Sequence, residues 1–325
     1  MNNRSGWLRV ALAAVFAWLA MLAVPAFAQQ PGPEVCANCH EDQVKAFSGS
    51  IHGKTAHPRS PAAAGPAACA SCHGDGSEHV KAGGGKGVGG MINLSSKTIP
   101  AEKRDQICLT CHEANRHLAF WDSGKHRKND VSCSDCHSVH NGVGQQLKVK
   151  GAQIAPMTTT SRVPQQEVCF NCHRDIKAMV MRPSHHPIVE GKIQCSSCHN
   201  PHGALTASMV NAESVKELCT SCHADKRGPF MFEHAPVEES CLNCHNPHGT
   251  RAAKLLNEKL PNLCQDCHDA AQHPGTIYDA DSGFGAGTGA TSGPNTRFLA
   301  RSCMNCHNEI HGSNAPASRG RRFVR

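Results

Sequence analysis

Apolar residues are concentrated in one run near the N-terminus, and the rest of the chain shows only short patterned segments. Residues 10–24 are continuously apolar. Beyond them, no segment keeps the alternation of apolar and polar residues that a half-buried strand requires. Helix-like composition occurs in residues 34–47, 165–181 and 213–223, each running through or up to a Cys-x-x-Cys-His sequence. This pattern predicts short α-helices joined by long irregular loops, with little or no β-sheet.

The N-terminal run is predicted to be a signal peptide. Arg4 and Arg9 precede or border it, and residues 26–28, Ala-Phe-Ala, have the small-x-small form of a signal peptidase site. The run is shorter than the about 20 residues that a membrane-spanning helix needs, which disfavours the alternative of a retained anchor. We therefore expect residues 1–28 to be removed and residues 29–325 to form an exported domain, in the periplasm if the source is bacterial.

Ten copies of Cys-x-x-Cys-His account for all 20 cysteines. Two thiols three positions apart can add across the two vinyl groups of one haem, and the histidine that follows is then held under the iron as its proximal ligand. Disulfides and zinc sites also use paired cysteines, but neither requires a histidine directly after the second cysteine in all ten cases. The sequence thus predicts ten covalently attached c-type haems.

The predicted attachment residues, motif by motif, are Cys36 and Cys39, Cys69 and Cys72, Cys108 and Cys111, Cys133 and Cys136, Cys169 and Cys172, Cys195 and Cys198, Cys219 and Cys222, Cys241 and Cys244, Cys264 and Cys267, and Cys303 and Cys306. The predicted proximal ligands, in the same order, are His40, His73, His112, His137, His173, His199, His223, His245, His268 and His307.

Thirteen further histidines are available for the opposite, distal side of the irons. The chain reads as five successive doublets, in which a first motif, a histidine, a second motif and another histidine three to six residues later follow one another. The predicted distal ligands are His52, His79, His126, His140, His185, His202, His234, His248, His273 and His311. The histidines left out are His57, His117 and His186, and the choice between His52 and His57 stays open.

His185 and His186 are adjacent, so only one of them is expected to bind an iron. His185 is preferred because residues 185–187 align with residues 234–236, where an alanine stands opposite His186. The alignment rests on the proline that ends both segments, and His186 is kept as the alternative.

The spacing also limits which iron a distal histidine can reach. His202 lies three residues after the proximal His199, too close to pass round the same macrocycle to its far face. The same holds for His140 and His248, and we expect it for His311. These histidines are therefore predicted to bind neighbouring haems, which requires the haems to pack closely. The individual pairings are not fixed by spacing.

Two imidazole ligands at every iron leave no position for a substrate, which indicates electron transfer rather than catalysis. Only seven methionines follow residue 28, and they do not repeat with the motifs, so methionine is a poor candidate for the distal ligand. We predict no catalytic residue. An enzyme with one open haem is the less favoured alternative.

Composition supports a chain organised around its cofactors. About 30 residues per haem are too few to build a conventional apolar core, so the haems themselves are expected to form it. Removal of Arg4 and Arg9 with the signal peptide lowers the formal charge from +7 to +5. Ten haems bring about −20 through their propionates and about +10 through ferric iron, so the basic sequence does not indicate a nucleic-acid partner. The glycine-rich residues 83–90 and residues 282–294 are predicted to be linkers or surface excursions, with a clamp on a partner as the alternative.

These motifs, together with the Cys-His-Asn-Pro-His segments at residues 198–202 and 244–248, resemble those of the periplasmic decahaem cytochromes of the MtrA, MtoA and DmsE type. The resemblance covers roughly residues 34–311. It implies an extended, mostly coil wire of bis-histidine haems, similar to two fused pentahaem cytochromes. The two halves would meet near residues 165–190.

The same resemblance implies partners and a location. It implies an outer-membrane β-barrel porin that holds the cytochrome, with periplasmic and inner-membrane redox carriers on one side and an outer-surface multihaem cytochrome on the other. Electrons would cross the outer membrane, in metal reduction or iron oxidation, and the resemblance does not fix their direction or the terminal donor or acceptor. A soluble periplasmic shuttle or electron store is the alternative function.

Overall fold

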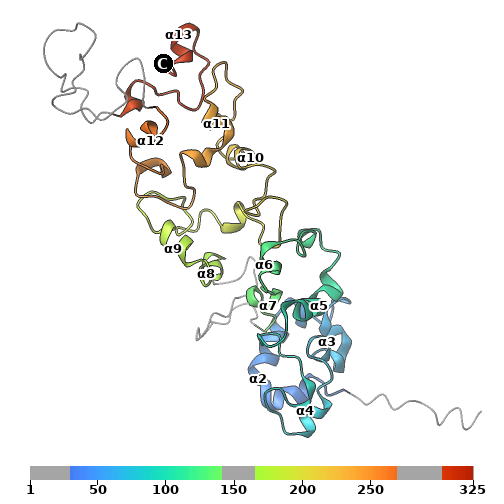
Figure 1. Cartoon of the computed structure of the whole chain (residues 1–325). Coiled ribbons are helices and arrows are strands. Elements are labelled where there is room, and N and C mark those ends of the chain that lie inside the picture. The colour runs from blue at the N-terminus through green and yellow to red at the C-terminus, as the bar shows by residue number, and fades with distance from the viewer. Residues whose placement is uncertain (1–29, 141–164, 269–301, 325) are drawn as a thin grey trace, which may run out of the picture. The chain divides into compact units, whose positions relative to one another are not determined.

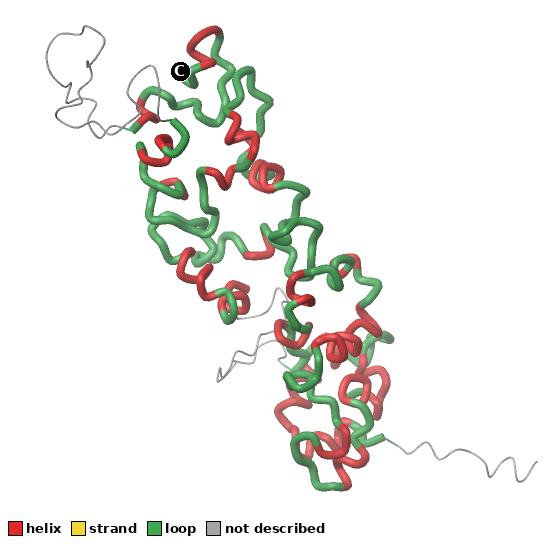
Figure 2. Tube along the Cα trace, viewed as in Figure 1, coloured by secondary structure: helices red, strands yellow, loops and turns green. Residues whose placement is uncertain are grey.

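The computed structural model describes residues 30–140, 165–268 and 302–324. The predicted signal peptide, His273 and the segment 282–294 lie outside these residues. Within them the chain consists of short helices and long loops, and its only β-type pairing is four isolated antiparallel bridges (Figure 2). The predicted fold of short helices and coil is confirmed.

The chain divides into two compact units, each described here by itself (Figure 1). The first unit comprises Met1–Ile99 and Val139–Gln145, and the second comprises Pro100–Ser138 and Gln146–Arg325. The first contains the α-helices α2 (Pro33–Gly49), α3 (Ala70–His73) and α4 (Ser77–Lys81), and the 3-10 helices η1 (Ile51–Gly53), η2 (Pro61–Ala67) and η3 (Val88–Gly90).

The second unit contains a longer series of equally short elements. Its α-helices are α5 (Ala101–His112), α6 (Lys125–Lys128), α7 (Cys133–Cys136), α8 (Gln165–Phe170), α9 (Arg174–Val180), α10 (Val215–Thr220), α11 (Ala235–Glu239), α12 (Asn262–Gln265) and α13 (Ala317–Arg321). Its 3-10 helices are η4 (Arg116–Leu118), η5 (Cys195–Ser197), η6 (Ala224–Lys226), η7 (Cys241–Asn243), η8 (Ala253–Leu255) and η10 (Cys303–Asn305).

The predicted helices are present, but the motif histidines interrupt them. Residues 34–47 lie in α2, where His40 has the non-helical angles φ −123° and ψ 43°. Residues 165–181 divide into α8 and α9, with a break at His173 (φ −88°, ψ 65°). The third prediction corresponds to α10, which ends at Thr220, before its motif histidine. Sequence composition does not register these breaks, because histidine itself is compatible with a helix.

Serine caps begin most of the elements that carry the second motif of a doublet. The side chains of Ser132, Ser240 and Ser302 each accept a hydrogen bond from the backbone N–H two residues later. Each serine directly precedes the first cysteine of its motif, so the cap fixes where the short helix begins. In the third doublet, Gln194 and Ser197 form a reciprocal pair instead.

The apolar core is small. Phe170, Val180 and Ile188 form a buried cluster, with Ile176 and Ile193 packed against it. Arg104 and Asp105 of α5 are among the largest fully buried side chains, each with 1% of its surface exposed. In the described parts of the chain, a polar network therefore takes a place that apolar side chains fill in most domains of this size.

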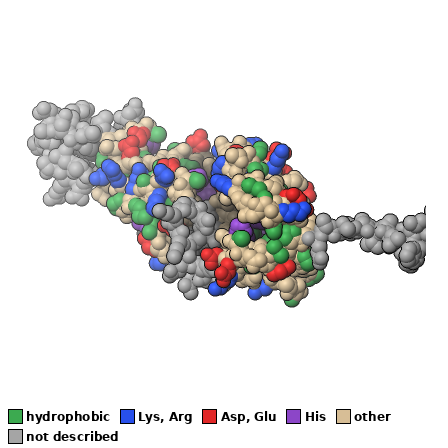
Figure 3. All heavy atoms as spheres, turned by 90° about the horizontal axis from the view of Figure 1, so that it is seen from below, with side chains coloured by type: hydrophobic (Ala, Val, Ile, Leu, Met, Phe, Trp, Pro, Cys, Tyr) green, Lys and Arg blue, Asp and Glu red, His purple; other side chains and the backbone are tan. Residues whose placement is uncertain are grey.

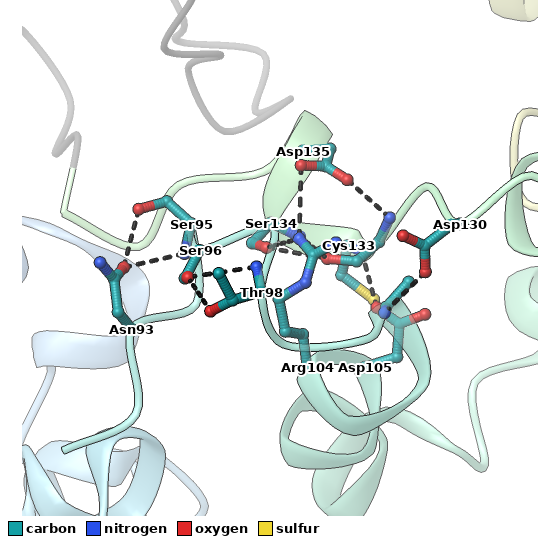
Figure 4. A network of polar contacts seen from close by, with 12 residues as sticks. Asn93, Ser95, Ser96, Thr98, Arg104, Asp105, Asp130, Cys133, Ser134 and Asp135 are labelled. Atoms are coloured by element: carbon teal, nitrogen blue, oxygen red, sulfur yellow. Dashed lines mark hydrogen bonds and ion pairs between the residues drawn. The ribbon is translucent and has the colours of Figure 1, made fainter. Parts of the chain in front are cut away.

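The network joins α5, before the third motif, to α7, which carries the fourth (Figure 4). The Arg104 guanidinium donates Nη1–H to the hydroxyls of Ser132 (2.9 Å) and Ser134 (3.2 Å) and lies 3.4 Å from Asp135 Oδ1. Asp135 in turn accepts a hydrogen bond from the backbone N–H of Ser132 at 2.9 Å. These contacts hold the second motif of this doublet against the helix of the first.

Asp105 extends the network in a second direction. Its carboxylate accepts hydrogen bonds from the Cys133 backbone N–H (2.9 Å) and from Trp121 Nε1–H (3.1 Å). Arg127 Nε lies 3.8 Å from the same carboxylate. A buried carboxylate held in this way is costly to remove, because its donors are then left without a partner in a dry environment.

We expect Asp105→Ala to destabilise the holoprotein by about 3 kcal/mol, since it removes one member of a buried charged network. A loss of this size lowers the urea midpoint by about 1 M. The matched control is Asp122→Ala, because Asp122 contacts the same Arg127 at 4.0 Å but its side chain is 90% exposed. Equal urea midpoints for the two variants would contradict the importance of the network.

Candidate haem ligands and attachment sites

Eight pairs of histidine rings face each other within the described residues, and each pair joins one motif histidine to one histidine outside the motifs. The pairs, with the distance between ring centroids, are His40–His79 (6.4 Å), His73–His140 (5.9 Å), His126–His173 (6.1 Å), His137–His202 (6.0 Å), His186–His223 (6.2 Å), His199–His248 (6.0 Å), His234–His268 (6.2 Å) and His245–His311 (6.1 Å).

This distance is the one that an iron between two imidazoles requires. A bond from a metal to an imidazole nitrogen is about 2 Å long, and the ring centroid lies about 1 Å behind that nitrogen. Two such ligands on opposite sides of one iron therefore place their centroids about 6 Å apart. The histidine pairs thus fit bis-histidine haem iron, with the motif residue as the proximal ligand.

Within the second unit, neighbouring doublets exchange their outer histidines. His126 of the second doublet faces His173 of the third, while His202 of the third doublet faces His137 of the second. The third and fourth doublets, and the fourth and fifth, are joined by the same reciprocal exchange. These further exchanges are His186–His223 with His248–His199, and His234–His268 with His311–His245.

The structure differs from the sequence-based expectation at His185. His186, rather than His185, faces the proximal His223. The His185 ring lies at the surface, with Nδ1 bonded to the backbone carbonyl of Arg182 and Nε2 3.0 Å from Glu190 Oε1. Both of its ring nitrogens are therefore engaged away from any iron.

The physical reason is the register of a β-bridge. Ser184 pairs with Thr250, and Phe232 pairs with Ser313, so Ser184 corresponds to Phe232 and His186 to His234. The alignment on the following prolines is one residue out of step with this correspondence. In extended backbone a shift of one residue turns the side chain to the opposite face.

The third and tenth motifs have no facing pair among those given above. Their proximal ligands, His112 and His307, stay predictions, and so do the distal ligands His52 and His273. His273 lies outside the described residues.

Backbone carbonyls orient many of the paired rings. Nδ1–H donates to a carbonyl oxygen, which leaves Nε2 and its lone pair directed at the partner ring. Such bonds run from His73 to Ile92 (2.8 Å), His126 to Pro201 (2.8 Å), His140 to Gln43 (3.1 Å), His186 to Pro247 (2.8 Å), His199 to Ser208 (2.9 Å) and His245 to Lys254 (2.9 Å).

The glycine-rich residues 83–90 serve a structural role of the same kind. They fold back on α4 through η3, and the Val88 carbonyl lies 3.1 Å from Nδ1 of His79. Gly89 has φ +71°, and a Cβ there would lie 2.3 Å from the backbone nitrogen of His79. The sequence analysis read this segment as a linker or excursion, whereas the structure makes it a support for His79.

Burial keeps several of the facing rings neutral. It lowers the pKa of His202, and the neighbouring His137 lowers it further. Burial likewise lowers the pKa of His137, His140 and His248. Neutral imidazole is the form that offers a lone pair to a metal, so the environment favours the coordinating state.

The first cysteines of the two motifs in each doublet lie together in space. Their thiols are hydrogen-bonded to each other in all five doublets, an arrangement found at Cys36–Cys69, Cys108–Cys133, Cys169–Cys195, Cys219–Cys241 and Cys264–Cys303. Before attachment, the bond from Cys169 lowers the pKa of Cys195 to about 7, which favours its reactive thiolate form.

The second cysteines of the motifs are more accessible than the first. All ten first cysteines are partly buried, whereas the second cysteines of six motifs are exposed. The exposed ones are Cys39, Cys111, Cys172, Cys222, Cys267 and Cys306, and the partly buried ones are Cys72, Cys136, Cys198 and Cys244.

Every one of the 20 cysteines is a free thiol in the structure, so none of them forms a disulfide. The structure therefore differs from the sequence-based prediction in one respect, because Cys39, Cys72, Cys111 and the other cysteines are described without a thioether bond. A thiol is the form from which that bond is made. The assignment of each cysteine to a particular haem stays a prediction.

Consecutive doublets also approach each other through their cysteines. Electrostatic interactions link Cys136 to Cys169, Cys198 to Cys222, and Cys244 to Cys267. The eight motifs of the second unit therefore form one unbroken file in the order of the sequence.

Two aromatic side chains pack on histidines of this file. Trp121 meets His202 edge to face, with 6.3 Å between ring centroids, and its indole N–H is bonded to the buried Asp105. Phe323 packs on His234 at 5.2 Å. Positive and negative side chains are interspersed on the face shown in Figure 3, with histidines visible among them. None of the helices in the described ranges is long and apolar enough to span a membrane.

Paired cysteines for covalent attachment, followed by a histidine that faces a second histidine at the distance of a shared iron, define a multihaem c-type cytochrome. Residues 185–228 and 234–273 match the family described as doubled CXXCH motif, and residues 69–155 match the one described as cytochrome c-type protein NrfB-like. The chain is 38% identical over 292 residues to the multiheme cytochrome MtrA of Shewanella baltica (strain OS185), covering 89% of this chain and 80% of that protein. The chain belongs to the MtrA family of multihaem cytochromes, as the resemblance predicted, and its role is electron transfer.

His186→Ala and His185→Ala form a matched pair of variants that tests the reassigned ligand. We expect His186→Ala to convert one haem, that of the seventh motif, to the high-spin form and to open it to carbon monoxide, because His186 faces His223. His185→Ala should leave all haems low-spin. Electron paramagnetic resonance of the oxidised proteins makes the comparison, and a high-spin signal in His185→Ala alone would restore the original assignment.

Proposed function

We propose that this cytochrome carries ten covalently bound haems and conducts electrons across the outer membrane while seated in a β-barrel porin. The observation that carries the proposal is the continuous file of attachment sites in the second unit, where each motif lies beside the next. When bound, each haem supplies an iron that gains and loses one electron.

The chain's own residues make that iron suited to electron transfer. Histidines on both sides leave no coordination position for a substrate, and the carbonyl bonds to Nδ1 fix the ring orientations. A ligand set that does not change with oxidation state requires little rearrangement when an electron arrives. This arrangement supports a non-enzymatic role, with no catalytic residue in the chain.

The membrane dimensions explain why a file is needed. The hydrocarbon layer is about 30 Å thick, or about 40 to 45 Å with headgroups, so several cofactors in succession are required to cross it. In the proposal the porin provides the lipid-facing surface and the cytochrome lies in its polar lumen. The mature protein would reach this site from the periplasm after removal of residues 1–28.

The partners follow from the same arrangement. Periplasmic or inner-membrane redox carriers would exchange electrons with one end of the file, and an outer-surface multihaem cytochrome or an extracellular metal would do so at the other. MtrA homology is the support for the porin and for the periplasmic location.

The count of ten haems is tested by the mass of the intact, denatured holoprotein. We expect the mass of residues 29–325 plus ten haems, since attachment through thioethers survives denaturation. A variant with Cys303→Ala and Cys306→Ala should carry nine. A wild-type mass corresponding to fewer than ten would contradict the count.

The location is tested by isolating the native outer membrane in mild detergent and identifying what migrates with the haem-stained band. We expect a large β-barrel protein to accompany this chain. A matched sample of the periplasmic fraction serves as the control, and recovery of the chain there, alone, would support the soluble shuttle instead.

A reconstituted system tests conduction itself. Liposomes that enclose a reduced dye and contain the barrel with this cytochrome should oxidise the dye when an external acceptor is added. Liposomes that contain the barrel alone should not, and equal rates in the two preparations would contradict the proposed conduit.

A further inference from the structure

The two Asn-Pro-His-Gly segments of the chain, residues 200–203 and 246–249, occupy the places where doublets exchange histidines. In the first segment, His202 faces the proximal His137. The carbonyl of Pro201, one residue earlier, accepts the Nδ1 hydrogen bond of His126 at 2.8 Å, and His126 faces a different proximal histidine, His173. One short segment therefore contacts the distal ligands of two irons.

The second segment repeats these contacts. His248 faces His199, while the Pro247 carbonyl lies 2.8 Å from Nδ1 of His186, which faces His223. In both segments the asparagine side chain accepts a hydrogen bond from the backbone N–H of the histidine, at 3.1 Å. The asparagine thus fixes the turn that presents the histidine.

The glycine that ends each segment lies where no side chain fits. Gly203 has φ +113°, and a Cβ there would lie 2.2 Å from the backbone oxygen of Phe120. Gly249 has φ +144°, and a Cβ there would lie 2.2 Å from the backbone oxygen of Met179. Contact with backbone oxygen cannot be relieved by turning a side chain, so any substitution must move the segment.

A third copy keeps the glycine while losing the proline. Gly312 follows the distal His311 and has φ +136°, and a Cβ there would lie 2.2 Å from the Phe230 ring. The backbone of Ile310, the residue before His311, is hydrogen-bonded to His234. Glycine is thus the shared element of all three exchanges within the second unit.

We infer that Gly203, Gly249 and Gly312 are positioning residues, each of which sets the axial ligands of two haems in adjacent doublets. The close approach of the glycine brings the exchanged segments together. The histidine after the turn then reaches one iron, while the carbonyl before it orients the histidine of another. This inference rests on the proposed bis-histidine ligation and adds a residue type that does not itself contact iron.

The test is Gly203→Ala in the full-length holoprotein. We expect the two haems served by His202 and His126 to become partly high-spin when oxidised and to bind carbon monoxide when reduced. Uptake should rise from none in the wild type to between one and two molecules per chain, with ten haems still attached. Gly191→Ala is the matched control, because Gly191 also has a left-handed backbone (φ +72°) but a Cβ there would meet nothing within 4 Å. It should bind none.

Asn200→Ala provides an independent variant in case Gly203→Ala does not accumulate. It removes the acceptor for the His202 backbone N–H without introducing a clash, so the same two haems should show a smaller high-spin fraction. Mass spectrometry and carbon monoxide binding after removal of His202 or His126 individually identify which haems respond.

The outcomes separate this inference from the proposed ligation. Carbon monoxide uptake by the wild-type protein would show that the bis-histidine premise itself is wrong. A closed wild type together with closed Gly203→Ala and Asn200→Ala proteins would leave the ligation intact and overturn the positioning role. A response at one haem only, or an equal response in Gly191→Ala, would also overturn it.

Discussion

The exchange of axial histidines between neighbouring doublets is the constraint on which the second unit depends. His126 and His202 cross between the second and third doublets, and equivalent pairs join the third to the fourth and the fourth to the fifth. Each doublet therefore completes sites in its neighbours. Because a ligand and its backbone must be placed together, the spacing of the irons and the path of the chain are determined by the same contacts. This explains how so many short helices and loops can be held in order with a small apolar core.

Polar contacts supply the local support for this arrangement. Carbonyl oxygens hold the imidazole rings, and the Asp105 carboxylate joins the Cys133 backbone to Trp121, which packs on His202. The path from a buried carboxylate to a distal ligand is thus continuous. Orientation of a ligand by its second ring nitrogen is a general feature of metal sites, and here it is supplied mainly by the backbone. The rigid surroundings favour ligands that stay in place as electrons pass.

Much of this could be predicted from the sequence, because covalent attachment leaves a local signature. The attachment cysteines, the proximal histidines and the division into doublets all follow from motif spacing, and the shortness of the interval from His199 to His202 indicated binding to a neighbouring haem. The choice of His186 over His185 depends on a bridge between Ser184 and Thr250, which are 66 positions apart, so no local pattern reveals it. The role of residues 83–90 in supporting His79 was missed for the same reason. Their glycines indicated a flexible linker, but positive φ and close backbone approach are equally good reasons for glycine.

A cryo-electron microscopy map of the holoprotein that resolves the iron ligands would test the central claim most directly. The account predicts that the haem attached at Cys133 and Cys136 is bound by His202 and that the haem attached at Cys169 and Cys172 is bound by His126. Density that joined either iron to a histidine of its own doublet would contradict the exchange, and with it the account of how the file of haems is held together.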